Sequence, residues 1–299
     1  MAEASAALRS GKLVAIPTET VYGLAARADD DAAVAAIYRA KGRPDFNPLI
    51  VHVPDLAAAD RLAVLDDRAR MLAAEFWPGP LTMVLPLRGG SGLAAAVTAG
   101  LPTVALRSPA HPVMRALLDA TELPLAAPSA NRSGAVSPTS AAHVASSLET
   151  GVAMILDGGV CKAGIESTIV ALRDDGSWQQ LRPGPIDHAR LEAVLGKSSA
   201  MNGGKAIEAP GQLASHYAPG KPLRLAVEAA DNDEFLIGFG SLAGNFNLSP
   251  GADLPQAAAR LYAALHLAAG SGFPRIAVVP IPDQGIGAAI NDRLRRAAA

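Results

Sequence analysis

The sequence predicts an α/β protein with a large twisted mixed sheet flanked by helices, followed by a small Rossmann-like α/β unit. Short aliphatic runs typical of strands alternate irregularly with helix-patterned segments over residues 1–196, which favours a mixed sheet over a strictly parallel one. Residues 197–220 are rich in Gly, Ser and Pro and lack periodicity, as is typical of a linker. At 299 residues the chain is long enough for a second, smaller domain, expected over residues 221–299.

Strands of the first domain are predicted where a short apolar run is bounded by Gly, Pro or polar residues. They cover residues 13–16, 49–53, 81–87, 103–107, 123–127, 152–156, 168–172 and 178–181.

Helices of the first domain are predicted where apolar residues recur at helical spacing behind a capping residue. They cover residues 3–10, 29–40, 55–61, 66–75, 111–120, 137–148 and 187–195. One of the three aspartates Asp29 to Asp31 can cap the second helix, and Gly42 ends it because Pro44 forbids continuation. Pro138 is expected in the first turn of the helix over 137–148, where proline is favoured.

The second domain is predicted to have strands at 223–227, 234–239 and 276–281 and helices at 254–269 and 286–296. The glycine-rich stretch 238–244 misses the dinucleotide-binding spacing by one residue, so we interpret it as a strand-to-helix turn.

Composition excludes several classes of protein. Half of the residues are hydrophobic, 18% are charged and the net charge is −2, so no excess of positive charge exists to hold nucleic acid non-specifically. Cys161 is the only cysteine, which excludes an intramolecular disulfide and a multi-cysteine zinc site. No run of about 18 apolar residues occurs, so we expect a cytoplasmic protein without membrane contact.

Two polar loops at strand ends are the first candidates for a site. Residues 17–20 carry threonine hydroxyls, which can bind an amino acid or nucleotide or can simply cap a turn. Lys41 and Arg43 follow the C-terminal end of a helix. They can complement the helix dipole, or they can clamp a phosphate, and the residues alone leave both readings open.

Further candidates lie at other strand ends. His52 and Arg107 each end a predicted strand. From the residues alone His52 is more often a structural histidine at a strand end, whereas Arg107 can equally meet a carboxylate ligand or pair with a surface acid. The loop over residues 128–134 offers Ser129 and Asn131 at a strand-to-helix junction. Cys161 has no histidine partner nearby in the sequence, which argues against a nucleophile. No Walker A motif or nucleophile elbow is present, so ATP would bind outside the usual nucleotide motifs.

Taken together, these segments resemble one family, the L-threonylcarbamoyladenylate synthases with a YrdC-like domain. The matching segments are PTETVYGL (17–24), KGRPDFNPL (41–49), WPGPLT (77–82), VALRSP (104–109), APSANRSG (127–134), GIESTIV (164–170) and LRPG (181–184). They span nearly all of residues 8–196 in the family's order. The tail, with APGQLASHYAP (209–219), is similar to the longer, two-domain branch of the family.

The resemblance implies a nucleotidyltransferase that makes threonylcarbamoyl-AMP and pyrophosphate from L-threonine, bicarbonate or CO₂, and ATP. The product would pass to downstream threonylcarbamoyl-transferase proteins that modify the adenosine beside the tRNA anticodon. Direct contact with tRNA is expected to be weak or indirect. Such a reaction needs positioning, charge neutralisation and exclusion of water more than a covalent nucleophile.

The resemblance also assigns roles to residues of this chain. Lys41 and Arg43 would be the catalytic cations, and Arg107 would meet the threonine carboxylate. The threonine pocket would consist of Thr20, His52, Arg107, Ala127 and Ser167. ATP would be held by Arg43, Asn47, Thr103, Ser129, Ser137, Arg182 and Tyr217. Mg²⁺ is expected to travel on the phosphates, since no carboxylate cage is evident and no protein metal ligand is predicted.

One departure from the family pattern concerns the linker, where Gln212 stands in place of a frequent methionine. We expect this polar side chain to loosen the linker and to weaken the role of Tyr217. Two alternatives remain: a module that clamps RNA on a concave sheet face, or the related carbamoyl-adenylate chemistry of hydrogenase maturation. The low net charge argues against the first, and the single cysteine excludes the zinc fingers of the second.

Overall fold

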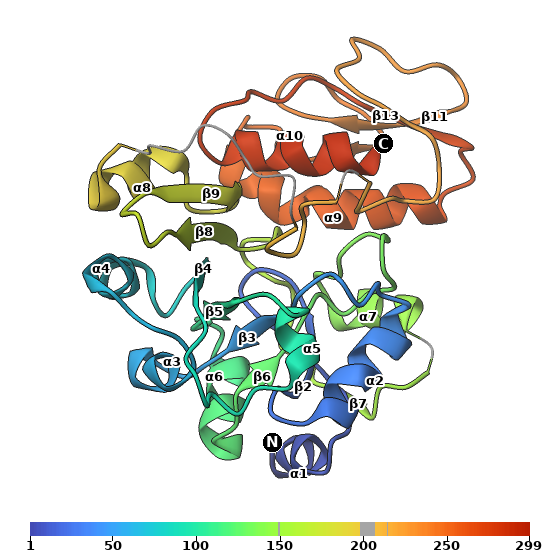
Figure 1. Cartoon of the computed structure of the whole chain (residues 1–299). Coiled ribbons are helices and arrows are strands. Elements are labelled where there is room, and N and C mark those ends of the chain that lie inside the picture. The colour runs from blue at the N-terminus through green and yellow to red at the C-terminus, as the bar shows by residue number, and fades with distance from the viewer. Residues whose placement is uncertain (149, 198–206, 214) are drawn as a thin grey trace.

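The computed structural model describes residues 1–148, 150–197, 207–213 and 215–299. It contains a nine-stranded mixed sheet and a four-stranded parallel sheet (Figure 1). Both are flanked by helices, so the expected α/β fold class is confirmed. The division at residues 196 and 221 stays a prediction, and residues 198–206 and 214 of the predicted linker lie outside the described residues.

The large sheet has the strand order β7-β1-β2-β6-β3-β5-β4-β8-β9, and the small sheet has the order β10-β13-β11-β12. The strands of the large sheet are β1 (Val14–Ile16), β2 (Gly23–Arg27), β3 (Ile50–His52), β4 (Leu81–Pro86), β5 (Thr103–Arg107), β6 (Leu125–Ala126), β7 (Met154–Ile155), β8 (Thr168–Leu172) and β9 (Trp178–Arg182). Those of the small sheet are β10 (Leu223–Arg224), β11 (Glu234–Gly238), β12 (Phe246–Asn247) and β13 (Arg275–Val278).

Most helices begin at the capping residues that the sequence indicates. They are α1 (Ala2–Arg9), α2 (Asp31–Lys41), α3 (Leu56–Leu62), α4 (Asp67–Phe76), α5 (Ala95–Thr98), α6 (Pro112–Thr121), α7 (Ala141–Ser147), α8 (His188–Leu195), α9 (Leu254–Gly270) and α10 (Ile286–Ala297). Asp30, Asp55, Asp66 and Asp187 each accept a hydrogen bond from the backbone N–H three residues on.

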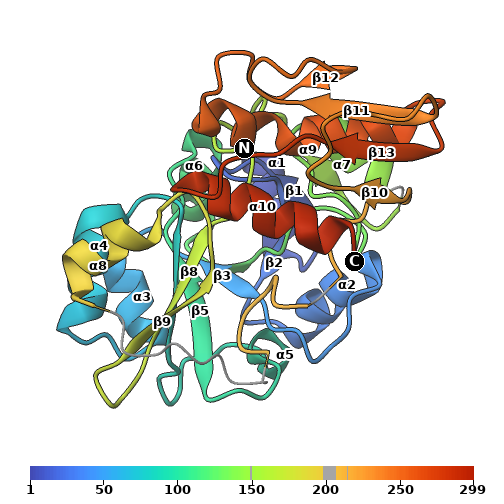
Figure 2. The same ribbon diagram turned by 90° about the horizontal axis from the view of Figure 1, so that it is seen from above.

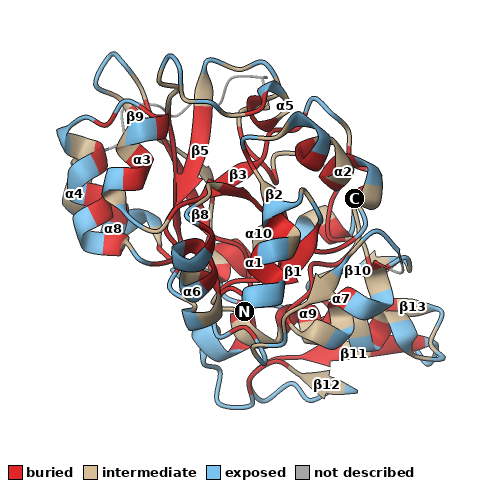
Figure 3. Cartoon of the chain, turned by 90° about the horizontal axis from the view of Figure 1, so that it is seen from below, coloured by how far each residue is buried: buried red, intermediate tan, exposed pale blue. Residues whose placement is uncertain are grey.

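Alternation of side chains along the strands gives the large sheet two different faces. Ala15, Leu24 and Val51 point to the face that packs against α2 and the other helices of the main core. The opposite face packs against α1 and α6 at the β1–β2–β6 end. Farther along, the opposite face carries Ile50 of β3 and is covered by Ala209, beyond α8 in the sequence. The burial colours of Figure 3 show the strands enclosed between these layers.

The small sheet meets the large domain through its helices. α9 and α10 lie between the two sheets (Figure 1), and α10 crosses above the strands of the large sheet when viewed from above (Figure 2). The core of the second domain includes Val21, Val136 and Ile165, which come from the first domain. The two parts of the chain therefore share one apolar interface.

Several sequence-based expectations were wrong in detail. The helix over 137–148 is shorter and begins after its cap Ser140, because Pro138 and its neighbours bond to other segments: the Pro138 carbonyl accepts from Tyr22 N at 2.9 Å. The stretch 238–244 connects β11 to the unpredicted strand β12, so it is not a strand-to-helix turn. Gly238 and Gly244 are needed there, because a Cβ on either would lie within 2.4 Å of a carbonyl oxygen across the turn.

The interface between the domains predicts one sharp stability difference. A Cβ on Gly164 (φ +69°) would lie 2.4 Å from the Cα of Ala259 in α9, whereas Gly176 (φ +86°) has open space. Gly164→Ala should therefore lower the free energy of unfolding by about 3 kcal/mol or more, through clash and strain together. Gly176→Ala, the matched control, should cost only the strain, about 1 kcal/mol. Urea denaturation measures both, and equal losses would contradict the close approach of α9.

Candidate active site

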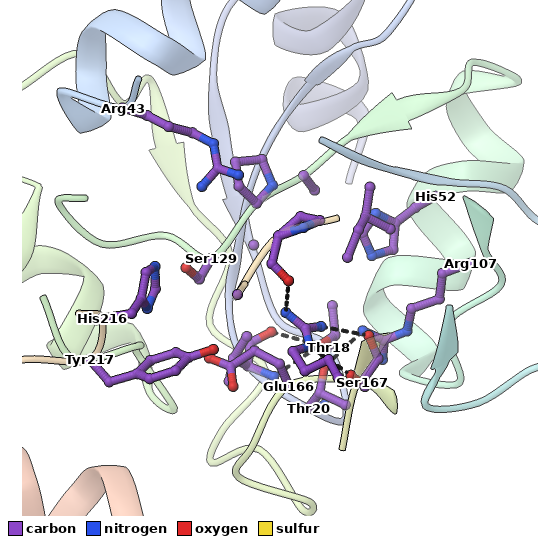
Figure 4. A pocket seen from close by; sticks show the side chains of 18 residues that line it. Thr18, Thr20, Arg43, His52, Arg107, Ser129, Glu166, Ser167, His216 and Tyr217 are labelled. Atoms are coloured by element: carbon purple, nitrogen blue, oxygen red, sulfur yellow. Dashed lines mark hydrogen bonds between the residues drawn. The ribbon is translucent and has the colours of Figure 1, made fainter. Parts of the chain in front are cut away.

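A cavity opens on the sheet face that carries Ile50, beneath residues 209–213 and 215–217, which we call the covering segment. Nine of the predicted site residues line it: Thr20, Arg43, His52, Arg107, Ala127, Ser129, Ser167, Arg182 and Tyr217. They come from six strands or their adjoining loops and from the chain beyond α8. Figure 4 shows them in two groups, with His52 and Arg107 on one side and Arg43, Ser129 and Tyr217 on the other.

The loop between β1 and β2 forms one wall of the cavity. Thr18 Oγ1 donates to the Val21 carbonyl at 2.6 Å and accepts from Thr20 N at 3.2 Å, which fixes a tight turn. The hydroxyls of Thr18 and Thr20 are 2.8 Å apart, and Thr20 Oγ1 also accepts from Arg107 Nη1 at 2.9 Å. The two readings of this loop therefore both hold: it is a capped turn, and its threonines line the cavity.

Arg107 is the best-anchored cation of the site. Nη2 donates to Glu19 Oε1 at 2.6 Å and Nε donates to the Gly79 carbonyl at 3.2 Å. With the bond to Thr20, these contacts use three of the five guanidinium N–H groups. Burial alone would raise the pKa of Glu19, but the neighbouring Arg107 holds that pKa below its usual value, so the pair is ionised. Arg107 therefore keeps donors for a ligand anion while its charge is balanced by Glu19.

His52 lies beside Arg107 because β3 and β5 are parallel neighbours with these two residues in register. Burial, and then the charge of Arg107, lower the pKa of His52 to about 3. Its Nδ1 is buried and has no hydrogen-bond partner among the described residues. The side chain is thus a neutral imidazole at neutral pH, with a free ring nitrogen beside the cavity.

Arg43 forms the opposite wall. α2 ends in a left-handed Gly42 (φ +59°), and this turn directs Arg43 inward, where only 9% of the residue is exposed. Its Nη2 donates to the Pro48 carbonyl at 2.9 Å, and burial lowers its pKa to about 10. Such burial exceeds what dipole complementarity at a helix end requires, which favours the ligand-binding reading.

Arg182 connects Ser167, just before β8, to Pro210. Its Nε donates to the Ser167 carbonyl and its Nη2 donates to Ser167 Oγ, each at 3.0 Å. Nη1 donates to the Pro210 carbonyl at 3.3 Å, which ties the covering segment to the sheet. Gln212, expected to loosen this segment, instead accepts from the backbone N–H groups of Glu208 and Ala209, at 2.7 and 2.9 Å. Gln212 therefore closes a local turn instead of loosening the chain there, while the role of Tyr217 stays a prediction.

Four predicted residues do not line the cavity. Lys41 lies directly behind it and donates to the carbonyls of Ser129 and Asn131, each at 2.5 Å; burial and then Arg43 hold its pKa well below the usual range. Asn47 is buried with Oδ1 unpartnered among the described residues. Thr103 begins β5, four residues before Arg107 and so roughly 13 Å along the strand.

The fourth of these residues, Ser137, donates to a residue that sequence reasoning missed, Glu166, at 2.6 Å. Glu166 lines the cavity; burial would raise its pKa, but Arg293 and Arg182 lower it to about 2. His216 also lines the cavity; burial lowers its pKa to about 4 and leaves Nδ1 unpartnered among the described residues. Both residues lie in segments that match the family, GIESTIV (164–170) and APGQLASHYAP (209–219), and this match could have identified them. Their partners lie far away in the sequence, so the contacts could not be predicted.

The donor set does not suit a resident metal ion. No group of three or more His, Cys, Asp or Glu side chains that could hold one occurs among the described residues. The two acids nearest the cavity, Glu19 and Glu166, are each paired with an arginine. Burial raises the pKa of Cys161 to about 12, so its thiol is protonated at neutral pH. In the part of the chain that is described, no helix is long and apolar enough to cross a membrane.

The fold and cavity define a class of protein: an α/β protein with a small-molecule site whose arginines, hydroxyls and neutral imidazoles suit anionic groups. A family model described as "Telomere recombination" matches residues 6–184, and one described as "Threonylcarbamoyl-AMP synthase, C-terminal domain" matches residues 186–299. The chain belongs to the threonylcarbamoyl-AMP synthase family.

Relatives match both parts of the chain. The chain is 41% identical to the threonylcarbamoyl-AMP synthase of Bacillus subtilis, with 100% of this chain and 92% of that protein covered. Identity to the Pyrococcus abyssi threonylcarbamoyl-AMP synthase is 38%, over 97% of this chain and 91% of the relative. A crystal structure of P. abyssi Sua5 complexed with L-threonine matches with a TM-score of 0.90 at 36% identity, covering 99% and 93% of the two chains. The resemblance inferred from the motifs is confirmed.

The buried His52 predicts a pH dependence of stability. The pKa of His52 is about 3 in the folded chain, against an ordinary value near 6.5. Between pH 3 and pH 6.5 its imidazole is therefore protonated in the unfolded chain but neutral in the folded one. Stability from this residue is complete above about pH 6.5 and falls by about 1.4 kcal/mol per pH unit below it. His52→Gln should show a shallower loss of unfolding free energy between pH 6.5 and 5 in urea titrations. An unchanged slope would mean that His52 titrates normally.

Proposed function

We propose that the chain condenses L-threonine, bicarbonate or CO₂, and ATP into threonylcarbamoyl-AMP and pyrophosphate. The observation that carries the proposal is the cavity with two different ends: Arg107 can bind a carboxylate at one end, and buried cations lie at the other. Similarity over the full chain to proteins named threonylcarbamoyl-AMP synthase supports the same reaction. The product would serve the threonylcarbamoyl modification of tRNA beside the anticodon.

At one end of the cavity, threonine is held through its carboxylate. Arg107 donates to the carboxylate, Thr20 holds the Arg107 guanidinium in place, and the neutral His52 lies beside it. Ala127 and Ser167 complete this pocket, and their small side chains leave room for the branched threonine. The first step requires the threonine amine to be held in place: the uncharged amine attacks the carbon of CO₂, and its proton passes to bicarbonate or water as the carbamate forms.

At the other end, the chain binds the nucleotide. Arg43, Ser129, Arg182 and Tyr217 line this end directly. Asn47, Thr103 and Ser137 are assigned to ATP as well, with Ser137 acting through its bond to Glu166. Mg²⁺ arrives with ATP as part of the substrate, since the described side chains offer no cage for it.

The transfer step needs no protein nucleophile. A carbamate oxygen attacks the α-phosphorus, the bond to the β-phosphate oxygen breaks, and pyrophosphate leaves with its electron pair. Arg43 acts as the catalytic cation and neutralises charge on the transferring phosphate, while Lys41, behind the cavity, is a positioning residue that fixes the loop carrying Ser129. Tyr217, which is 1% exposed, keeps bulk water from the labile carbamate.

The wider context follows from the reaction. The product is a mixed anhydride that hydrolyses readily, so it would pass to downstream threonylcarbamoyl-transferase proteins. We propose weak or indirect contact with tRNA, a cytoplasmic location and no membrane association.

Omission of single substrates tests the reaction. Conversion of ATP to AMP and pyrophosphate should require both threonine and bicarbonate, with each omission reducing the rate to background. Pyrophosphate release is measured with a coupled phosphate assay, and the product is identified by mass spectrometry. Turnover that ignores threonine would overturn the proposal, and tight, salt-sensitive RNA binding without turnover would favour the RNA-binding alternative.

Replacing Arg107 and Arg43 with alanine, one at a time, tests the two ends of the site separately. Arg107→Ala should weaken threonine binding by about 10- to 100-fold, because a charge-assisted contact is lost, and should leave ATP binding nearly unchanged. Arg43→Ala should give the reverse pattern, so each variant is the control for the other. Calorimetric titration with each substrate measures both affinities, after melting curves confirm folding. If Arg107→Ala bound threonine normally, the carboxylate partner would be assigned wrongly.

A further inference from the structure

Glu166 is an acid in the wall of a cavity that is otherwise suited to anions. Both of its oxygens are occupied: Oε1 accepts from Ser137 Oγ at 2.6 Å, and Oε2 accepts from Tyr262 Oη at 2.8 Å and from Arg293 Nε at 2.9 Å. Tyr262 belongs to α9 and Arg293 to α10. Two of the three donors that fix this acid therefore come from the second domain.

Arg293 is the most buried cation of that domain, with 0% of the residue exposed. Its Nη1 donates to Asp292 Oδ2 at 2.8 Å, and its Nη2 has no hydrogen-bond partner among the described residues. The guanidinium carbon lies 5.4 Å from the centre of the Tyr217 ring, within the range of a cation–π contact. One side chain outside the cavity thus contacts two residues of its wall, Glu166 and Tyr217.

The same helix also holds the backbone of the covering segment. His216 N donates to the Arg296 carbonyl at 3.0 Å, and Arg296 donates to the Leu213 carbonyl. Ser215 Oγ donates to the Ala299 carbonyl at 2.9 Å. α10 and the residues after it are therefore bonded both to Glu166 and to the covering segment, although no residue of α10 lines the cavity.

We propose that Arg293 is a positioning residue for ATP, which holds Glu166 and Tyr217 in place from the second domain. The inference rests on the proposed function and gives the second domain a task in it. Without Arg293, Glu166 would be a buried carboxylate without its main counter-charge, facing a bound triphosphate. Repulsion between the two anions, together with a freed Tyr217 ring, would weaken ATP binding while threonine still met Arg107.

The test compares Arg293→Met with the double variant Glu166→Gln/Arg293→Met. Arg293→Met should raise the KM for ATP and the Kd for a non-hydrolysable ATP analogue by about tenfold or more. The Kd for threonine should change by less than about threefold. The double variant removes both charges together, so its ATP affinity should recover to within about threefold of Glu166→Gln alone. A role in stability alone would not produce this split between substrates.

Arg295→Met is the matched control, because Arg295 is an exposed residue two positions along the same helix. It should leave both affinities and kcat unchanged. If Arg293→Met fails to fold, Tyr262→Phe replaces it, since it removes a single donor to Glu166 at nearly constant volume. Tyr262→Phe should then raise the KM for ATP by about threefold, in the same direction.

Three results would overturn the inference: unchanged ATP affinity in a folded Arg293→Met, an equal loss of threonine affinity, or no recovery in the double variant. If Arg293→Met cannot be folded, unchanged ATP affinity in Tyr262→Phe would overturn it as well. Because the analogue is measured by binding, these outcomes remain distinct from failure of the proposed function, which would appear as absent turnover in the unsubstituted chain.

Discussion

The site depends on keeping positive charge inside the protein without acids to neutralise all of it. Arg43, Arg107 and Arg182 are buried around one cavity with Lys41 behind it, while among the described residues the acids that face them are Glu19, paired with Arg107, and Glu166 in the cavity wall. Backbone carbonyl oxygens accept most of the hydrogen bonds that these side chains donate, at Ser129, Asn131, Pro48 and Gly79 among others. Carbonyl dipoles satisfy hydrogen bonds without cancelling charge, so the cavity retains an attraction for anions that a set of salt bridges would have removed.

Sheet topology decides which of these groups meet. β3 and β5 are parallel neighbours, which brings His52 beside Arg107, and β8 lies next to β4, which brings Ser167 within 2.7 Å of Thr82. The ligand site lies on the sheet face that carries Ile50. At the β1–β2–β6 end α1 and α6 cover this face, and beside Ile50 it is covered by Ala209, which follows α8 in the sequence. The cavity is thus lined mostly by residues of the large sheet and its loops and is closed by residues that follow α8.

The starts of several helices and the turn before Arg43 could be predicted from the sequence, because helix caps and turns depend on a few neighbouring residues. Aspartate caps gave the helix starts, and the left-handed Gly42 gave the turn that aims Arg43. β2 was missed because Gly-Leu-Ala-Ala-Arg has no β-branched residue; it is a strand because β1 and β6 pair with it on both sides. The roles of Glu166 and His216 depend on partners about 80 to 130 residues away, at Arg293 and Arg296, and no local pattern encodes such contacts.

The ion pair between Arg107 and Glu19 has a consequence for selectivity among amino acids. Because Glu19 already balances the guanidinium, that end of the cavity is electrically neutral before any ligand enters. In the proposed binding mode, a ligand carboxylate that meets Arg107 would add one negative charge to a pair that is already neutral, and a second carboxylate in the same place would add another. The pair would therefore favour ligands with a single carboxylate over dicarboxylates of similar size.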